Sequence, residues 1–377
     1  MSEVQWRVIS SYIGAGRFAL RDDRVIVGTE AGVECLPRIK DSGPKWKVDF
    51  GSRCIGVQEM SEAGDGDLLA TCRSGLLLLS GDGDEELEKL FSEPVVHEAL
   101  PMGEQLVVAT GTTLLLYDGI DGGLEWRYSF LDLLGQSVEA VRLVNLFELG
   151  GTHIVAGVVD YDSGVGRVVV LDKDGEVQWE SPPGPLSEVF PSGKDRFVWS
   201  FTSFPGKFES RCTTTSGDDV FGLDFAGVGT ALPDGSVAMV IGTNEAPKWD
   251  NWDLRIVAPD GSVTTELTAK GRAPVRPICT PDGSVYFIGY VLHLDPASSR
   301  VDYTNFFAMP QELHFQHLVG IRKQIPEYEI YVQRFQPGSE TVEVLYHLPG
   351  SFSLAQPQLF GSGEVVFCDG PDIVAIS

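Results

Sequence analysis

A short phrase built around a tryptophan returns along the chain, and it constrains the fold more than any other feature. The phrases EVQWRV, GPKWKVDF, GLEWRYSF and GEVQWES contain Trp6, Trp46, Trp126 and Trp179. The first three tryptophans are 40 and then 80 residues apart, and the fourth follows after 53. A period of about 40 to 50 residues is typical of repeat architectures, in which each unit buries its apolar face against its neighbours. The sequence therefore predicts an array of similar units.

Short apolar runs and tight turns indicate that each unit is made of strands. The runs RVIVGTE at 24–30 and HIVAGVV at 153–159 are rich in residues that favour strands. The pentapeptide Pro-Asp-Gly-Ser-Val starts at Pro233, Pro259 and Pro281. Its Asp-Gly step favours the positive φ angles of a tight hairpin turn. We expect the first and third copies to join the first two strands of a unit, and the middle copy to join the last two.

The predicted fold is all-β, a single closed β-propeller of four-stranded antiparallel blades that spans residues 1–377. The last range, 351–377, supplies three strands, and residues 4–10 supply the missing fourth. Such a closure, which joins residues 1–10 to 351–377, removes an open sheet edge. The repeat count gives nine blades, and eight are the alternative because 310–350 lacks a clear second strand. The eight units before the last range are 10–50, 51–93, 94–135, 136–182, 183–225, 226–271, 272–309 and 310–350.

The tryptophan phrase resembles the repeat of the quinoprotein-like (PQQ-like) β-propellers, which ends in an aspartate, a glycine and a tryptophan. The matching residues are Asp172, Gly175 and Trp179, with looser copies at Asp118, Gly122 and Trp126 and at Asp41, Gly43 and Trp46. The resemblance implies that the tryptophan packs between blades and that the Asp-Gly step turns the third strand into the fourth. Enzymes of that family bind PQQ and calcium under a disulfide of adjacent cysteines. No adjacent cysteines occur here, so the resemblance favours a non-quinone member, a scaffold or ligand-binding domain without PQQ.

The balance of charge argues against two classes of partner. The chain has 54 acidic and 28 basic residues, for a net charge of −26. Nucleic acid and anionic membrane surfaces need clustered Lys and Arg, so neither is expected as a partner. Excess acidity is typical of soluble proteins, and attraction of a basic protein or a cation is the alternative interpretation. The six cysteines form no CxxC pair, and the first 25 residues hold no apolar segment. We expect a cytoplasmic protein with reduced thiols.

Candidate binding residues lie in the loops that join the second strand of a unit to the third. These loops are long and aromatic at 159–167, 200–210 and 243–253, and 324–329 adds a fourth. Exposed aromatic side chains in loops are typical of recognition surfaces. The alternative is that the rings fold back and cover their own blades. The predicted binding residues are Tyr161, Phe204, Phe208, Trp249, Trp252 and Tyr328.

No sequence motif predicts catalysis. The chain lacks an HExxH motif, a phosphate-binding loop and a recognisable Ser-His-Asp set. Asp-rich turns can supply calcium ligands, with Asp160 and Asp162 as first candidates, although such turns are also ordinary solvated hairpins. We therefore predict a non-catalytic propeller scaffold that binds a protein partner or a small ligand through the aromatic loops. The alternative is a calcium-assisted hydrolase or lactonase with its site in the central channel.

Overall fold

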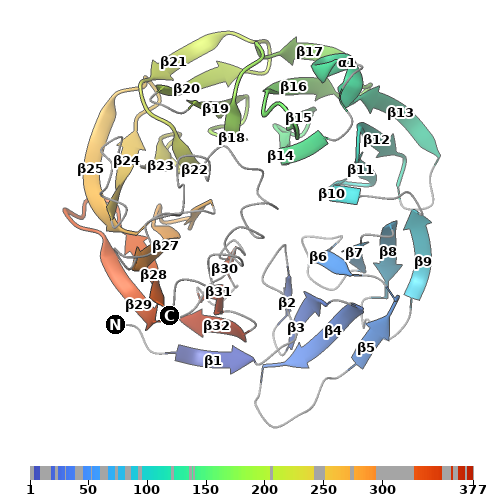
Figure 1. Ribbon diagram of the computed structural model, residues 1–377, viewed down its shortest axis with the longest axis horizontal. Helices are drawn as coiled ribbons and strands as arrows, with labels where there is room; N and C mark the ends of the chain where they lie inside the picture. The colour runs from blue at the N-terminus through green and yellow to red at the C-terminus, as the bar shows by residue number, and fades with distance from the viewer. Residues whose placement is uncertain are drawn as a thin grey trace. The chain divides into compact units, whose positions relative to one another are not determined.

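The structure is a computed structural model built almost entirely of β-strands (Figure 1). Its described strands form eight four-stranded antiparallel sheets. They belong to two compact units, Ser2–Ser129 with Ser353–Ser377 (the split unit) and Phe130–Phe352 (the continuous unit). The residues that the structure describes are 4–8, 18–21, 24–29, 31–38, 46–51, 53–59, 67–72, 75–80, 86–91, 96–119, 123–135, 138, 141–203, 207–241, 251–271, 276–293, 327–349, 358–359, 364–369 and 372–376.

The split unit contains four of these sheets. In three of them, successive strands along the chain pair with one another. These sheets are β2 (Ala19–Arg21), β3 (Arg24–Gly28), β4 (Gly32–Pro37) and β5 (Trp46–Asp49); β6 (Cys54–Glu59), β7 (Leu68–Cys72), β8 (Gly75–Leu79) and β9 (Glu86–Phe91); and β10 (Val96–Met102), β11 (Gln105–Thr110), β12 (Thr113–Tyr117) and β13 (Leu124–Ser129).

The fourth sheet of the split unit joins the two ends of the sequence. β1 (Val4–Val8) pairs with β32 (Asp372–Ile376), followed by β31 (Val365–Asp369) and β30 (Gln358–Leu359). Arg7 lies opposite Val374, and Val8 lies opposite Ile373. The prediction that an N-terminal strand completes a sheet of three C-terminal strands is confirmed. Pairing with β1 covers an edge of β32 that would otherwise be open to pairing with another chain.

The continuous unit also contains four sheets, whose first strands contact one another in chain order. A short helix, α1 (Phe130–Leu134), precedes them. Among the described residues no helix is long and apolar enough to span a membrane. The sheets are β14 (Val141–Leu149), β15 (His153–Asp160), β16 (Gly166–Asp172) and β17 (Val177–Glu180); β18 (Leu186–Pro191), β19 (Arg196–Ser203), β20 (Lys207–Thr214) and β21 (Asp219–Leu223); β22 (Gly227–Ala231), β23 (Val237–Ile241), β24 (Asn251–Val257) and β25 (Val263–Lys270); and β26 (Ile278–Cys279), β27 (Val285–His293), β28 (Glu327–Phe335) and β29 (Glu343–Pro349).

The last sheet of the continuous unit corrects the repeat count. The ranges 272–309 and 310–350 were predicted as separate blades, but β27 pairs directly with β28 from Val285↔Phe335 to His293↔Glu327. The two ranges therefore form one sheet, and the described strands make eight sheets instead of nine. The error has a simple cause. Residues 294–326, which lie outside the described residues, separate the second and third strands by nearly the length of a repeat.

The predicted hairpin turns lie between the expected strands. The first and third Pro-Asp-Gly-Ser-Val segments join β22 to β23 and β26 to β27, and the middle one joins β24 to β25. Their glycines, Gly235, Gly261 and Gly283, have φ angles of 82°, 89° and 84°. These are left-handed conformations that glycine adopts without steric cost. The local sequence therefore determines how these strands are connected.

The repeated tryptophan packs between neighbouring sheets, as the family resemblance implied. In β17 the ring of Trp179 lies 5.8 Å from Phe197 and 6.0 Å from Trp199, both in β19 of the next sheet. A β-bulge in the pairing of β17 with β16 comes just before Trp179, and bulges of this kind re-aim the following side chain. Trp46 packs in the same way against the core shared by the two sheets that begin with β2 and β6. The tryptophan phrase is thus a signal for packing between sheets.

Candidate functional site

Trp252, one of the six predicted aromatic residues, is buried instead of exposed. Trp252 is only 9% exposed and packs in a core with Phe287 and Phe335 of the next sheet. The prediction that Trp252 lies on an exposed rim is wrong, because β24 already begins at Asn251 and Trp252 shares the buried face of that strand with Leu254. The ring lies in the core that its own sheet shares with the next sheet.

The other predicted aromatic residues differ in their placement. Tyr328 lies in β28 opposite Leu292, so it belongs to a strand instead of the predicted loop. Phe204 and Trp249 lie outside the described residues. Tyr161 is half-buried in the turn between β15 and β16, and Phe208 is half-buried near the start of β20. Phe208 borders a hollow in the surface.

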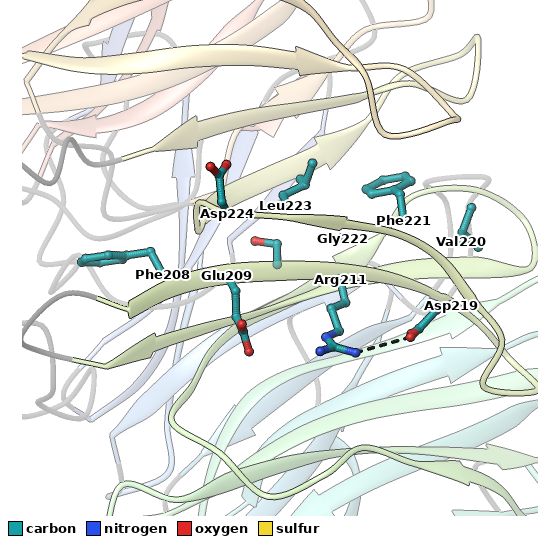
Figure 2. A pocket seen from close by; sticks show the side chains of 10 residues that line it. Phe208, Glu209, Arg211, Asp219, Val220, Phe221, Gly222, Leu223 and Asp224 are labelled. Carbon is teal, nitrogen blue, oxygen red and sulfur yellow. Dashed lines mark hydrogen bonds and ion pairs between the residues drawn. The ribbon is translucent and has the colours of Figure 1, made fainter.

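That hollow, which we call the β21 hollow, follows the last two strands of one sheet of the continuous unit (Figure 2). Its volume is about 540 Å³. In Figure 2, Phe208 and Asp224 lie at one end of the strand pair, and Asp219 and Val220 lie at the other. The full lining is Phe208, Glu209, Ser210, Arg211, Asp219, Val220, Phe221, Gly222, Leu223 and Asp224.

The depth of the β21 hollow has a cause in the sequence. Trp199, Arg211 and Gly222 are register partners on three adjacent strands, so they share one face of the sheet. The Trp199 ring is buried, and the guanidinium of Arg211 lies 5.9 Å from the centre of that ring. The row then ends at Gly222, where a Cβ atom would meet nothing within 4 Å. A missing side chain at the outer strand therefore leaves the face open.

The charges around the β21 hollow are mainly negative. Glu209, Asp219 and Asp224 are three carboxylates, and Arg211 is the single cation of the lining. Arg211 is already paired, because its Nη1 lies 3.4 Å from Oδ2 of Asp219. The three carboxylates therefore outnumber the one cation of the lining. Val220 adds apolar surface beside them, with 37% of its area exposed.

The acidic residues proposed as calcium ligands belong to a turn. The carboxylate of Asp160 accepts hydrogen bonds from the backbone N–H of Asp162 at 3.1 Å and from Oγ of Ser163 at 2.5 Å. The bond from Ser163 lowers the pKa of Asp160. Both oxygens of Asp160 are thus used to fix the turn. Among the described residues, no three His, Cys, Asp or Glu side chains are grouped so that they can hold a metal ion.

A buried ion pair that the sequence did not reveal connects three sheets of the continuous unit. Nε of Arg276, just before β26, donates to Oε1 of Glu188 in β18 at 2.7 Å. Its Nη2 donates to the carbonyl of Val144 in β14 at 3.0 Å. Burial raises the pKa of the Glu188 carboxyl, and the charges of Arg276 and Arg142 oppose that effect. The partners are 88 and 132 residues apart, so no local pattern could have indicated this contact.

Comparisons with known proteins agree on the fold. No protein-family model matches the chain, and no curated protein matches its sequence. The crystal structure of BamB from Moraxella catarrhalis is similar over 100% of this chain and 98% of its own, with a TM-score of 0.57 and 13% identity. The structure of the Dos1 propeller is similar over 100% of this chain and 93% of its own, with a TM-score of 0.59 and 10% identity. The chain therefore has a β-propeller fold.

Proposed function

We propose that this chain is a non-catalytic β-propeller of the PQQ-like type, a cytoplasmic scaffold that holds a protein partner against its surface. The observation that carries the proposal is the β21 hollow, an open and mainly acidic recess bordered by Phe208 and Val220. Recognition surfaces combine apolar anchors with charged groups at their margins. A small ligand on the same surface is the second form of the proposal.

Two features support the family and the compartment in this proposal. The aspartate of the PQQ-like phrase organises the turn at 172–179, since Oδ1 of Asp172 accepts hydrogen bonds from the N–H groups of Asp174 and Glu176. Gly175 in the same turn has a φ of 80°. The cysteines whose side chains are described are all free thiols, and Cys54 is buried. Free buried thiols suit a reducing compartment.

The charge of the protein indicates what sort of partner it holds. With a net charge of −26, the chain attracts basic surfaces and repels acidic ones over a distance of several ångströms. The β21 hollow concentrates the same sign of charge in Glu209, Asp219 and Asp224. We expect the partner to present Lys or Arg side chains around an apolar contact, and we expect its association rate to fall as salt is added.

The aromatic anchor can be tested with single variants of the full chain. We expect Phe208→Ala to reduce capture of protein partners from a lysate of the source cells at least about ten-fold, because a few apolar anchors carry much of the binding free energy of an interface. The measurement is quantitative mass spectrometry of proteins retained on the immobilised chain. Trp249→Ala, measured in the same way, tests whether the predicted loop residue at this position also takes part in binding.

The control for this test is Tyr128→Ala. Tyr128 is a half-buried aromatic residue in β13, outside the predicted loops. This variant should retain partners as the unmodified chain does, and thermal unfolding should show that the Phe208 variant is still folded. Retention of the same proteins in the same amounts by Phe208→Ala and the unmodified chain would reject the proposed surface.

A further inference from the structure

We propose that the free edge of β21 receives an extended segment of the protein partner as an added strand of its sheet. This inference rests on the proposed function and names the way in which the partner is bound. The sheet has the order β18-β19-β20-β21, so β21 is its outer strand. Among the described residues no strand pairs with its other edge. The backbone N–H and C=O groups along an open edge are available for another chain.

The composition of β21 leaves this edge open. Natural edge strands are commonly protected by lysine, proline or another charge placed within the strand. β21 reads Asp-Val-Phe-Gly-Leu; its one charged residue is Asp219 at the start of the strand, and it contains no Lys, Arg or Pro. Other outer strands of the chain carry a basic residue, as the sequences of β5, β13 and β25 show with Lys47, Arg127 and Lys270. The edge of β21 is therefore less protected than those edges.

Gly222 marks the place where the added strand would come closest. A glycine inside a strand weakens the strand, and it often marks a close approach by another backbone or a ligand. Gly222 is exposed, and the space above it is empty to 4 Å. Arg211, its register partner, fills the same face on the inner side. One apolar side chain of the incoming strand can enter the β21 hollow over Gly222 and contact Val220.

The charges select among the segments that could pair with this edge. Asp219 is the first residue of β21, and Asp224 follows its last residue. An incoming segment with Lys or Arg near its ends carries charge of the opposite sign to these two residues. A second copy of this chain does not fit, because edge-to-edge pairing of two β21 strands would bring like charges together. The occupant is thus a strand of a different protein, apolar at alternate positions and basic at its ends.

The experiment uses a random peptide library displayed on phage and selected on the full immobilised chain. We expect the enriched peptides to alternate apolar and polar residues and to contain Lys or Arg. A synthetic copy of an enriched peptide should bind at least about ten-fold more weakly to Gly222→Val than to the unmodified chain. Valine favours strands, so this variant keeps the sheet and fills only the β21 hollow.

Two controls separate strand addition from simple contact. Gly123→Val alters another exposed glycine that has nothing within 4 Å, and it should leave peptide binding unchanged. Methylation of alternate backbone nitrogens of the peptide removes the donors that a strand ladder needs. We expect it to weaken binding at least about ten-fold.

The outcomes distinguish this inference from the proposed function. Strand addition is overturned if no peptide is enriched, if Gly222→Val binds normally, or if the methylated peptide binds as well as the parent. In each of these cases the proposed partner surface still stands if Phe208→Ala loses the natural partner. If Phe208→Ala keeps the natural partner while the peptide behaves as expected, the edge accepts strands and the proposed aromatic anchor is wrong.

Discussion

Replacement of Arg276 by Ala should lower the free energy of unfolding of the continuous unit by about 3–5 kcal/mol, because it leaves a buried carboxylate without its partner. The side chain of Glu188 is 12% exposed, and Arg276 is its ion-pair partner at 2.6 Å. The same arginine also satisfies the carbonyl of Val144 in β14. A single truncation therefore removes contacts to two other sheets. Chemical denaturation followed by circular dichroism measures the loss.

The stability lost in Arg276→Ala should increase as the pH rises. The folded-state pKa of Glu188 is raised by burial, so relative to the unfolded chain the folded form favours the protonated carboxyl. The stability that this group contributes is present below its unfolded pKa and is lost as the pH rises through its folded pKa. Removal of Arg276 takes away the larger of the two opposing charges and raises the pKa further. We expect the deficit of Arg276→Ala to grow as the pH rises above the usual pKa of a glutamate side chain.

Two further variants decide whether the buried charge is the cause. In the double variant Arg276→Ala with Glu188→Gln the buried group is neutral, so much of the stability should return and the pH dependence should largely disappear. Arg167→Ala is the matched control, because Arg167 and Glu180 form an exposed pair at 3.1 Å. Its loss should stay below about 1 kcal/mol. Equal losses in Arg167→Ala and Arg276→Ala would contradict our account of the buried pair.

Features encoded within a few neighbouring residues could be predicted from the sequence. The Pro-Asp-Gly-Ser-Val turns and the tryptophan phrase each specify one local geometry, and the structure contains them where they were expected. The pairing of β1 with β32 followed from counting strands, because a range with three strands needs a fourth from elsewhere. These inferences needed only strand periodicity and turn chemistry.

Other features depend on the tertiary structure. Trp252 was expected in a loop because a loop and a strand with alternating residues look alike at their boundary, and its burial is decided by Phe287 and Phe335 of the next sheet. The long segment between β27 and β28 resembled a repeat in length alone. The β21 hollow had a sequence signal that could have been used, since Gly222 interrupts a run of strand-forming residues. The pairing of Arg276 with Glu188 had none.

Replacement of Gly217 by Ala should lower the free energy of unfolding of the continuous unit by about 2–5 kcal/mol, because it adds both backbone strain and overpacking. Gly217 has a φ of 90°, and an added Cβ would lie 2.1 Å from Cδ1 of Trp179. The indole would have to leave its place against Phe197 and Trp199. Phe221 and Gly261 repeat this arrangement one sheet further along, since a Cβ at Gly261 would lie 2.5 Å from Cβ of Phe221.

The matched control for Gly217→Ala is Gly338→Ala, which separates strain from packing. Gly338 has a φ of 81° in the same unit, and a Cβ there would meet nothing within 4 Å. This variant adds backbone strain alone, so it should lower the free energy of unfolding by about 1–2 kcal/mol. The difference between the two variants, measured by chemical denaturation, is the contribution of the indole contact. Trp179→Phe should reduce that difference, because a smaller ring leaves room for the added methyl group. If both glycine variants lose the same stability, the tryptophan phrase does not hold neighbouring sheets together in this way.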